Sequence, residues 1–206
     1  MTPPKFLYFD LGMVLVNFDV RVMCRQMGDV AGMDPARVYQ VLLEHPLQKE
    51  YERGRITTRE FFEGFCRATG TRPDLDALIR AGSDIFELNA SMVPVAAQLY
   101  RAGWRMGILS NTCESHWEHC LRRFPLLGEL FEVDALSYRI GAAKPEAAIF
   151  AAAAELAGVA PEAIFFTDDL PGHVSGAQAV GFDAVQFISP PQLVADLRAR
   201  GVSLNY

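Results

Sequence analysis

The sequence predicts an α/β protein: a Rossmann-like, doubly wound parallel β-sheet core that carries an inserted helical cap subdomain. Three observations lead to this prediction. Short apolar runs end in polar residues, helical patterns lie between these runs, and the stretch from Asp10 to Met106 contains helical patterns without a convincing strand. Continuous apolar runs are typical of strands buried on both faces, and strands that alternate with helices are typical of an open parallel sheet.

Strands are expected in chain order over residues 6–9, 106–109, 163–166 and 184–187. Between them the pattern predicts helices, for example over 93–101 and 145–156. The second of these helices opens with proline, which is favoured at the first helical position because its missing N–H is not needed there.

The stretch between the first two strands reads as a series of amphipathic helices. They are expected over 20–30, 35–43, 58–68 and 75–86, and polar breaks at 53–55 and 69–71 separate some of them. Polar, glycine-containing breaks of this kind mark loops between helices. We therefore predict a core formed by residues 1–15 and 91–206 and a helical insert over 16–90.

Composition limits the classes of partner. The 206 residues include 25 acidic and 19 basic side chains, so the net charge is −6, which argues against nucleic acid or an anionic membrane as the main partner. The longest clean apolar run, 147–154, is too short to span a bilayer, and the N-terminus lacks signal-peptide features. Four cysteines without a CxxC pair do not suggest a disulfide framework, so a soluble cytoplasmic protein is expected.

Polar side chains follow three of the four apolar runs. In an open parallel sheet, ligands bind at the carboxyl ends of the strands, so these side chains should meet at one edge. A lysine before Pro145 lies on a loop that leads into a helix at the same edge. The expected set is Asp10, Ser110, Asn111, Lys144, Asp168 and Asp169.

Three neighbouring carboxylates raise one another's pKa unless a cation lies among them. A hard divalent ion with oxygen ligands suits this set, and magnesium is the expected one. An aspartate can also act as a nucleophile, and Lys144 can hold a phosphate or a carboxylate. The set therefore indicates phosphoryl transfer by covalent catalysis.

Four segments, in order, resemble the motifs of the haloacid dehalogenase (HAD) superfamily. They are residues 9–15 (FDLGMVL), 109–112 (LSNT), 143–146 (AKPE) and 165–169 (FFTDD). Residues 51–57 (YERGRIT) are similar to the cap of its sugar-phosphate phosphatase and epoxide-hydrolase-like branch. The resemblance covers nearly the whole chain and implies a helical cap that closes over the active site of a Rossmann-like core.

The resemblance also implies roles for individual residues. Asp10 matches the nucleophile, which is also a metal ligand, and the backbone carbonyl of Gly12 matches a second metal ligand. Asp169 matches the acidic metal ligand, and Asp168 beside it would bind the metal directly or through water. Ser110 and Asn111 match the phosphate-holding motif, and Lys144 matches the lysine that steadies nucleophile and phosphate. The implied activity is a Mg2+-dependent phosphatase for a small phosphorylated metabolite, for example a sugar phosphate.

One position departs from the typical motif. Most phosphatases of the superfamily have an aspartate two residues after the nucleophile, as general acid and base, and here that position is Gly12. General acid–base help contributes about 10²- to 10⁴-fold. In this superfamily a branch of sugar-1-phosphate phosphatases also carries Asp-Leu-Gly, so Gly12 does not imply inactivity. It shifts the expected substrates toward good leaving groups, or toward substrates and waters that supply the proton. His173 is a candidate proton carrier.

Alternatives remain open at this stage. A metal-independent 2-haloacid dehalogenase also lacks the second aspartate, and Arg21 or Arg25 could line its carboxylate pocket. A non-catalytic binding member of the family is another alternative. A zinc site is chemically possible at Cys113, His116, His119 and Cys120, which share one helix face. The sequence leaves the exact substrate, the general acid and the oligomeric state undetermined.

Overall fold

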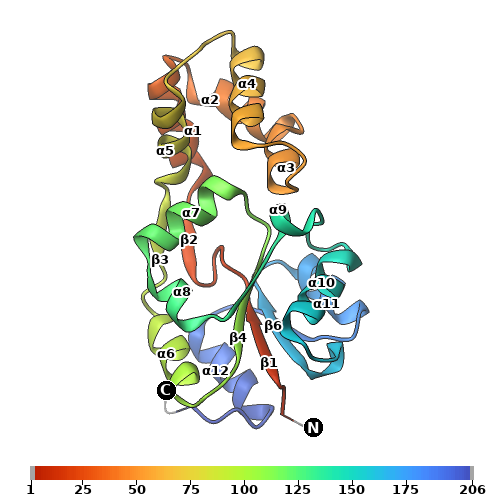
Figure 1. The fold of residues 1–206 in the computed structure, drawn as a ribbon. Helices are drawn as coiled ribbons and strands as arrows, with labels where there is room; N and C mark the ends of the chain where they lie inside the picture. The colour runs from red at the N-terminus through yellow and green to blue at the C-terminus, as the bar shows by residue number, and fades with distance from the viewer. Residues whose placement is uncertain (1–2, 205–206) are drawn as a thin grey trace.

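The computed structural model describes residues 3–204, and its centre is a parallel sheet (Figure 1). Five strands pair in the order β5-β4-β1-β6-β7, and every pair is parallel. They are β1 (Phe6–Phe9), β4 (Met106–Ser110), β5 (Val133–Leu136), β6 (Ile164–Asp168) and β7 (Asp183–Gln186). The predicted α/β class with a Rossmann-like parallel sheet is confirmed.

Alternate side chains of β1 enter two separate hydrophobic cores, one on each face of the sheet. Leu7 and Phe9 belong to one core, whereas Phe6 and Tyr8 belong to the other. Helices α6 (Val93–Arg101) and α12 (Pro190–Ala199) bury residues in the first core, and α10 (Ala147–Ala157) and α11 (Pro171–Ala179) in the second. Helices on both faces explain why the strands are apolar throughout.

Strand β5 was not expected from the sequence. Its apolar run is interrupted by Asp134, so the pattern of a strand buried on both faces is weak there. It becomes the edge strand beside β4, and short helices surround it: α7 (Glu114–Arg123), α8 (Leu126–Leu130) and α9 (Ser137–Ile140). A short 3-10 turn, η2 (Pro161–Ala163), precedes β6.

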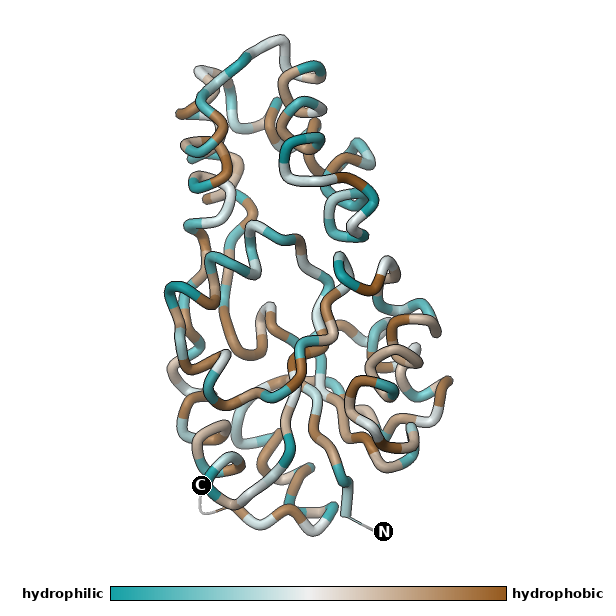
Figure 2. Tube along the Cα trace, in the orientation of Figure 1, coloured by the Kyte–Doolittle hydropathy of each residue, from teal (hydrophilic) through white to brown (hydrophobic). Residues whose placement is uncertain are grey.

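A second layer of helices lies above the carboxyl edge of the sheet (Figure 1). It comprises α1 (Val20–Ala31), α2 (Pro35–Tyr39), the π-helical turn η1 (Gln40–Glu44), α3 (Leu47–Glu52), α4 (Thr58–Thr69) and α5 (Leu75–Ser83). Their tubes alternate between hydrophobic and hydrophilic segments in Figure 2, as amphipathic helices do. We call residues 20–83 the upper helical layer.

The chain enters and leaves this layer through a two-stranded antiparallel ribbon, β2 (Val16–Phe18) and β3 (Phe86–Leu88). The sequence predicted neither strand, and the expected helix over 75–86 was wrong at its end, because α5 stops at Ser83 and Phe86 pairs with Phe18. Helix α3 was also not expected. The division into a core (1–15 and 91–206) and an insert (16–90) stays a prediction.

Local signals account for the helix boundaries. The Thr57 side chain and Glu60 form a capping box at the start of α4, and Gly70, in the left-handed conformation, ends it. Among residues 3–204 the helices are all too short or too polar to cross a membrane.

Candidate active site

The ends of β1, β4 and β6 bring the predicted polar residues to one edge of the sheet. Phe9 lies opposite Ile108 on one side and Thr167 on the other, so Asp10 follows at the level where both neighbouring strands end. Asp168 closes β6 and Ser110 closes β4. The register therefore places Asp10 between strands β4 and β6, which carry Ser110 and Asp168.

Lys144 joins these residues from the loop between α9 and α10. Its side chain is fully buried, and its Nζ lies 2.9 Å from Asp10 Oδ1 and 2.6 Å from Asp168 Oδ2. It also donates to the carbonyl of Leu109 at 2.9 Å and lies over the ring of Phe166. A buried ammonium with three oxygen acceptors is satisfied, and it ties the ends of three strands together.

Asn111 fixes the loop that presents this lysine. Its Oδ1 accepts the Lys144 backbone N–H at 2.8 Å, and its Nδ2 donates to the Lys144 carbonyl at 3.0 Å. Ser110 is buried, and its hydroxyl reaches an acceptor only at 3.5 Å, which is a weak hydrogen bond. In this structure Asn111 acts on the lysine loop, while the Ser110 hydroxyl is available to a ligand.

The two carboxylate oxygens of Asp10 differ. Oδ1 accepts the Leu11 backbone N–H at 2.7 Å in addition to the Lys144 ammonium. Oδ2 has no partner among the described residues. Burial raises the pKa of Asp10 above its ordinary value, Lys144 opposes that shift, and Asp168 adds to it. One oxygen is therefore held in place, whereas the other makes no hydrogen bond with the described residues.

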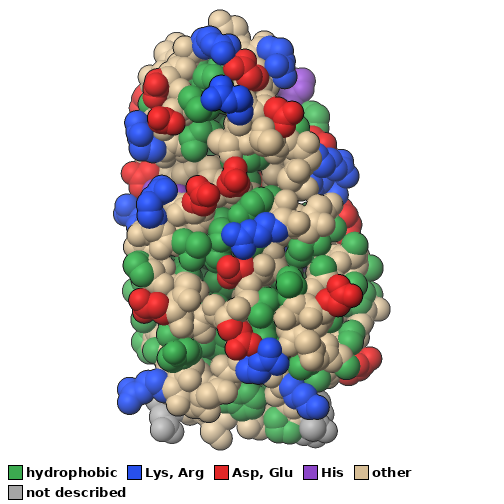
Figure 3. All heavy atoms as spheres, in the orientation of Figure 1, with side chains coloured by type: hydrophobic (Ala, Val, Ile, Leu, Met, Phe, Trp, Pro, Cys, Tyr) green, Lys and Arg blue, Asp and Glu red, His purple; other side chains and the backbone are tan. Residues whose placement is uncertain are grey.

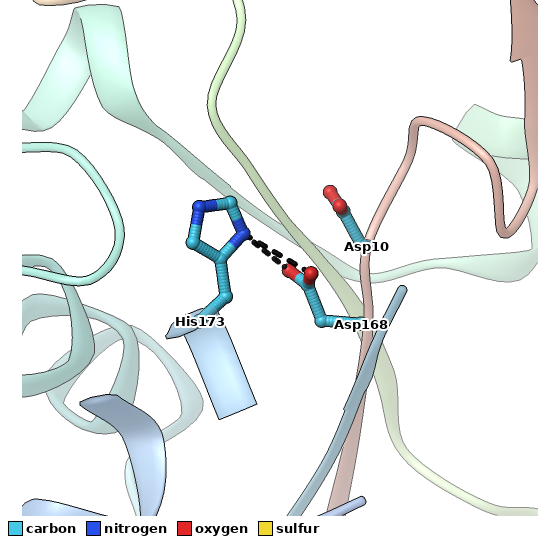
Figure 4. Close-up of side chains that lie close together, drawn as sticks. All are labelled: Asp10, Asp168 and His173. Atoms are coloured by element: carbon cyan, nitrogen blue, oxygen red, sulfur yellow. Dashed lines mark hydrogen bonds and ion pairs between the residues drawn. The ribbon is translucent and has the colours of Figure 1, made fainter. Parts of the chain in front are cut away.

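Asp168 is fully buried and its carboxylate is saturated with donors. Besides Lys144 it accepts the Leu170 N–H at 2.8 Å, and His173 Nδ1 lies 3.0 and 3.1 Å from its two oxygens (Figure 4). Although burial opposes ionisation, the His173 hydrogen bond and the Lys144 charge hold the pKa of Asp168 below its ordinary value. The other ring nitrogen of His173 points away from Asp10 in Figure 4, which favours a positioning role over direct proton transfer at Asp10.

Asp169 is half-buried, and its carboxylate forms no ion pair and no hydrogen bond with another described residue, although its own backbone N–H donates to it. Burial, and then the neighbouring Asp168, raise the pKa of Asp169. Asp10 and Asp168 thus share the Lys144 ammonium, whereas Asp169 is not among the side chains grouped with them at short distance within residues 3–204. Oxygen donors and excess negative charge suit a hard divalent cation such as magnesium.

The geometry gives a more restricted set of metal-binding candidates than the sequence did. Within residues 3–204, side chains whose ligand atoms lie within 4.8 Å of one another are Asp10, Asp168 and His173. The zinc alternative finds no support, since its residues form no such group in the described chain and burial raises the pKa of Cys113 and of Cys120 to about 12. Metal-binding cysteines need the thiolate form.

The Phe18 ring lies against Gly12, the position at which typical phosphatases of the superfamily have their second aspartate. A Cβ atom on Gly12 would approach Phe18 Cε1 to 2.8 Å, closer than real Cβ contacts. The next residue, Met13, has a left-handed φ of 57°, which is uncommon for a residue with a side chain. A side chain at position 12 would therefore require the partly exposed Phe18 ring to move, and no signal in the sequence linked Phe18 to this loop.

The upper helical layer contacts this edge of the sheet through the segment after α3. Gly54 has φ +65°, and a Cβ there would lie 2.0 Å from the Tyr138 carbonyl oxygen. Arg53 forms an ion pair with Glu146, two residues beyond the catalytic lysine candidate. The Ser137 hydroxyl lies 2.5 Å from the carbonyl oxygen of Glu52 and accepts the Thr112 N–H at 2.9 Å. The sequence marked residues 53–55 only as a polar break.

Arg21 does not form the pocket that the dehalogenase alternative requires. Its side chain is 88% exposed, and its guanidinium pairs at 2.8 Å with Asp19, two residues earlier in the chain. Arg25 is exposed as well.

Known proteins share these features. The family model for haloacid dehalogenase-like hydrolases matches residues 30–181, which is most of the chain. A phosphatase of Mycobacterium tuberculosis (strain CDC 1551 / Oshkosh), MT3486, is 33% identical over 116 residues. That match covers 54% of this chain and 54% of the relative, so the chain spans about half the length of that relative.

Two solved structures superpose closely on this fold. The HAD family enzyme bt-2542 of Bacteroides thetaiotaomicron, in complex with magnesium and inorganic phosphate, has a TM-score of 0.81 and 26% identity, with 91% of this chain and 96% of that chain covered. A predicted HAD-like family hydrolase of Porphyromonas gingivalis has a TM-score of 0.84 and 25% identity, with 96% and 99% covered. Together with the sheet and the ordered motifs, these matches show that the chain belongs to the haloacid dehalogenase-like hydrolases.

Proposed function

We propose that the protein is a magnesium-dependent phosphatase that hydrolyses a small phosphorylated metabolite through an aspartyl phosphate on Asp10. The observation that carries this proposal is the asymmetry of the Asp10 carboxylate. Lys144 and the Leu11 N–H hold Oδ1, whereas Oδ2 has no partner among the described residues. A nucleophile needs such an oriented, unpaired oxygen.

In the first step Asp10 Oδ2 attacks phosphorus, the bond to the ester oxygen breaks, and the leaving group departs with the bonding electron pair. In the second step water attacks the same phosphorus and gives up a proton to solvent, and the bond to Oδ2 breaks to release inorganic phosphate and restore the carboxylate. The oxygen that left in the first step takes up a proton from solvent. Lys144 offsets negative charge beside Asp10 throughout, and the Ser110 hydroxyl is free to donate to a phosphate oxygen.

Magnesium fits this donor set. Asp10, the Gly12 carbonyl and the Asp169 carboxylate would hold it, and Asp168, whose oxygens are already occupied by donors, would contribute through water while keeping Lys144 in place. The ion would offset charge on the transferred phosphoryl group. The magnesium and phosphate found with the Bacteroides thetaiotaomicron relative support this assignment.

The loop at Gly12 narrows the class of substrate. Because Gly12 has no side chain, this position supplies no carboxylic acid to protonate the leaving oxygen. Substrates whose leaving groups are stable without early protonation are therefore favoured, and sugar 1-phosphates meet this condition.

The helical segment would act as the cap. Residues 16–90 would cover the site formed by 1–15 and 91–206, and the contact of Gly54 with the Tyr138 carbonyl would set how closely the segment seats. Excluding water from the site strengthens the electrostatic interactions of Asp10 and Lys144.

The test is phosphate release from a panel of sugar, nucleoside and aryl phosphates, with magnesium and then with EDTA. Asp10→Asn is compared with Asp29→Asn, an exposed aspartate on α1 that serves as a matched control. We expect turnover that requires both magnesium and Asp10 and is unchanged in the control. Equal turnover in Asp10→Asn would refute the mechanism.

An absence of phosphate release from every substrate of the panel would also contradict the proposed phosphatase activity. Halide release from 2-chloropropionate without metal would then favour the dehalogenase. A thermal shift with a ligand but no turnover would favour a non-catalytic binding protein.

A further inference from the structure

A basic hollow lies away from the candidate active site, where the upper helical layer meets the helices beside the sheet. It encloses about 360 Å³ and is lined by Arg80, Asp84, His119, Arg122 and Arg123. In Figure 3 basic side chains gather at the left edge, at the height where Figure 1 shows α5 above α7. Its volume lies within the range of small-molecule sites, which is about 300–1,000 Å³.

The charges of this hollow are not balanced. Three guanidinium groups face one carboxylate, that of Asp84, which lies 3.3 Å from Arg123 and 3.6 Å from His119 Nε2. Arg80 and Arg122 form no ion pair with any residue of the described chain. In a protein of net charge −6, this leaves uncompensated positive charge in a concave place.

A buried polar atom points to a missing partner as well. His119 Nε2 is buried, and no hydrogen bond to it is found within residues 3–204. Burial lowers the pKa of His119, the Asp84 carboxylate opposes that shift, and the charges of Arg122 and Arg123 add to it. Asp84, at 3.6 Å, is too far away for a hydrogen bond, so this buried nitrogen has a free-energy cost that a hydrogen bond from a bound ligand or water would remove.

The walls of the hollow come from two parts of the chain. Arg80 lies near the end of α5 and Asp84 just beyond it, whereas His119, Arg122 and Arg123 belong to α7. None of the five lies in the candidate active site, which is near the opposite end of α7, a helix of ten residues and therefore about 14 Å long. The hollow is thus separate from the site of chemistry.

We propose that this hollow binds a phosphate group, either as inorganic phosphate or as part of a phosphate ester, at the junction of α5 and α7. Arginine pairs with phosphate oxygens through two parallel N–H donors, and two unpaired arginines on opposite walls can each do so. A dianion would match the uncompensated charge, and His119 Nε2 would gain a hydrogen-bonding partner.

The test follows the imidazole proton signals of His119 by NMR while inorganic phosphate is added. The protein contains four histidines, so His119→Gln assigns the signal. The titration is done with EDTA and with chloride that keeps the ionic strength constant. We expect a saturable shift, at least tenfold weaker binding in Arg80→Ala/Arg122→Ala, and unchanged binding in Arg59→Ala/Arg67→Ala, a control pair of exposed arginines on α4.

Asp10→Asn separates this hollow from the catalytic site. The His119 shift should persist in that variant, and its loss would show that phosphate acts from the active site instead. The proposal would be wrong if the shift did not saturate, or if the two double-arginine variants weakened phosphate binding equally. In that case the arginines only offset the negative ends of α5 and α7. Glycerol 3-phosphate distinguishes the ligand source: tighter binding than inorganic phosphate identifies an ester site, and equal binding identifies the phosphate group alone.

Discussion

Replacement of Lys144 by methionine tests how strongly this side chain holds the carboxyl edge of the sheet together. The substitution keeps a long, flexible side chain but removes the ammonium that Asp10, Asp168 and the Leu109 carbonyl share. Two buried carboxylates would then face each other without a counter-charge, and the carbonyl would lose its donor.

The expected loss of stability follows from these contacts. Removing one partner of a buried ion pair costs about 3–5 kcal/mol. An unsatisfied buried carbonyl adds about 1–3 kcal/mol, and the buried methionine side chain offsets roughly 1–2 kcal/mol of that sum through hydrophobic burial. We therefore expect the free energy of unfolding to fall by roughly 3–6 kcal/mol at pH 8.

The loss should depend on pH. In the wild type the lowered pKa of Asp168 contributes stability that is present above its unfolded pKa and is lost as pH falls through the folded value. The pKa of Asp10 is already raised in the wild type; without the lysine we expect it to rise further and the pKa of Asp168 to rise as well, so the variant is least stable when both are ionised. The difference between wild type and variant should thus shrink as pH falls from 8 toward 5.

Urea unfolding of the metal-free protein measures this difference. Lys49→Met is the control, because Lys49 is exposed on α3 and the chemical change is the same. A surface change of this kind should stay within about 0.5 kcal/mol. A Lys144→Met loss below about 1 kcal/mol, or one that grows toward acid pH, would contradict the assignment of Lys144 as a buried bridge between ionised carboxylates.

Further predictions concern the loops and the partner of Asp168. Gly54→Ala should lower the thermal midpoint and raise KM for phosphate release, because a Cβ would lie 2.0 Å from a carbonyl oxygen at a positive φ; an unchanged KM would show that this contact does not seat the cap. Gly12→Asp alone should lower kcat, because the new side chain would collide with the Phe18 ring. The double variant Gly12→Asp/Phe18→Ala should hydrolyse alkyl phosphates, which have poor leaving groups, at least tenfold faster than the single variant. The reason is that general acid–base help is worth about 10²- to 10⁴-fold. Equal rates in the two variants would mean that the ring does not obstruct the acid. His173→Ala should reduce kcat with little change in KM. His173→Gln keeps an N–H donor for Asp168 and should recover part of the lost kcat. A raised KM with unchanged kcat would instead indicate that His173 contacts the substrate.

The sequence alone determined the fold class and the composition of the candidate site. Each central strand is buried on both faces, so its residues must be apolar, and such runs are visible without any structure. Because parallel strands end at one edge, the polar residues after these runs had to converge. The proximity of Asp10, Lys144 and Asp168 follows from that topology and from the ordered motifs.

Other features were decided by contacts between distant segments, for which a local pattern carries no signal. The three-residue strands β2 and β3 are too short to show a period, and they form because the chain leaving the upper helical layer pairs with the chain entering it. Three further contacts depend on three-dimensional placement. They are the close approach of Phe18 to Gly12, the contact of Gly54 with α9, and the two hydrogen bonds between Asn111 and the Lys144 backbone. Burial and hydrogen bonding also separate Asp168, which positions Lys144, from Asp169, which is left free, although the two are adjacent and chemically identical in the sequence.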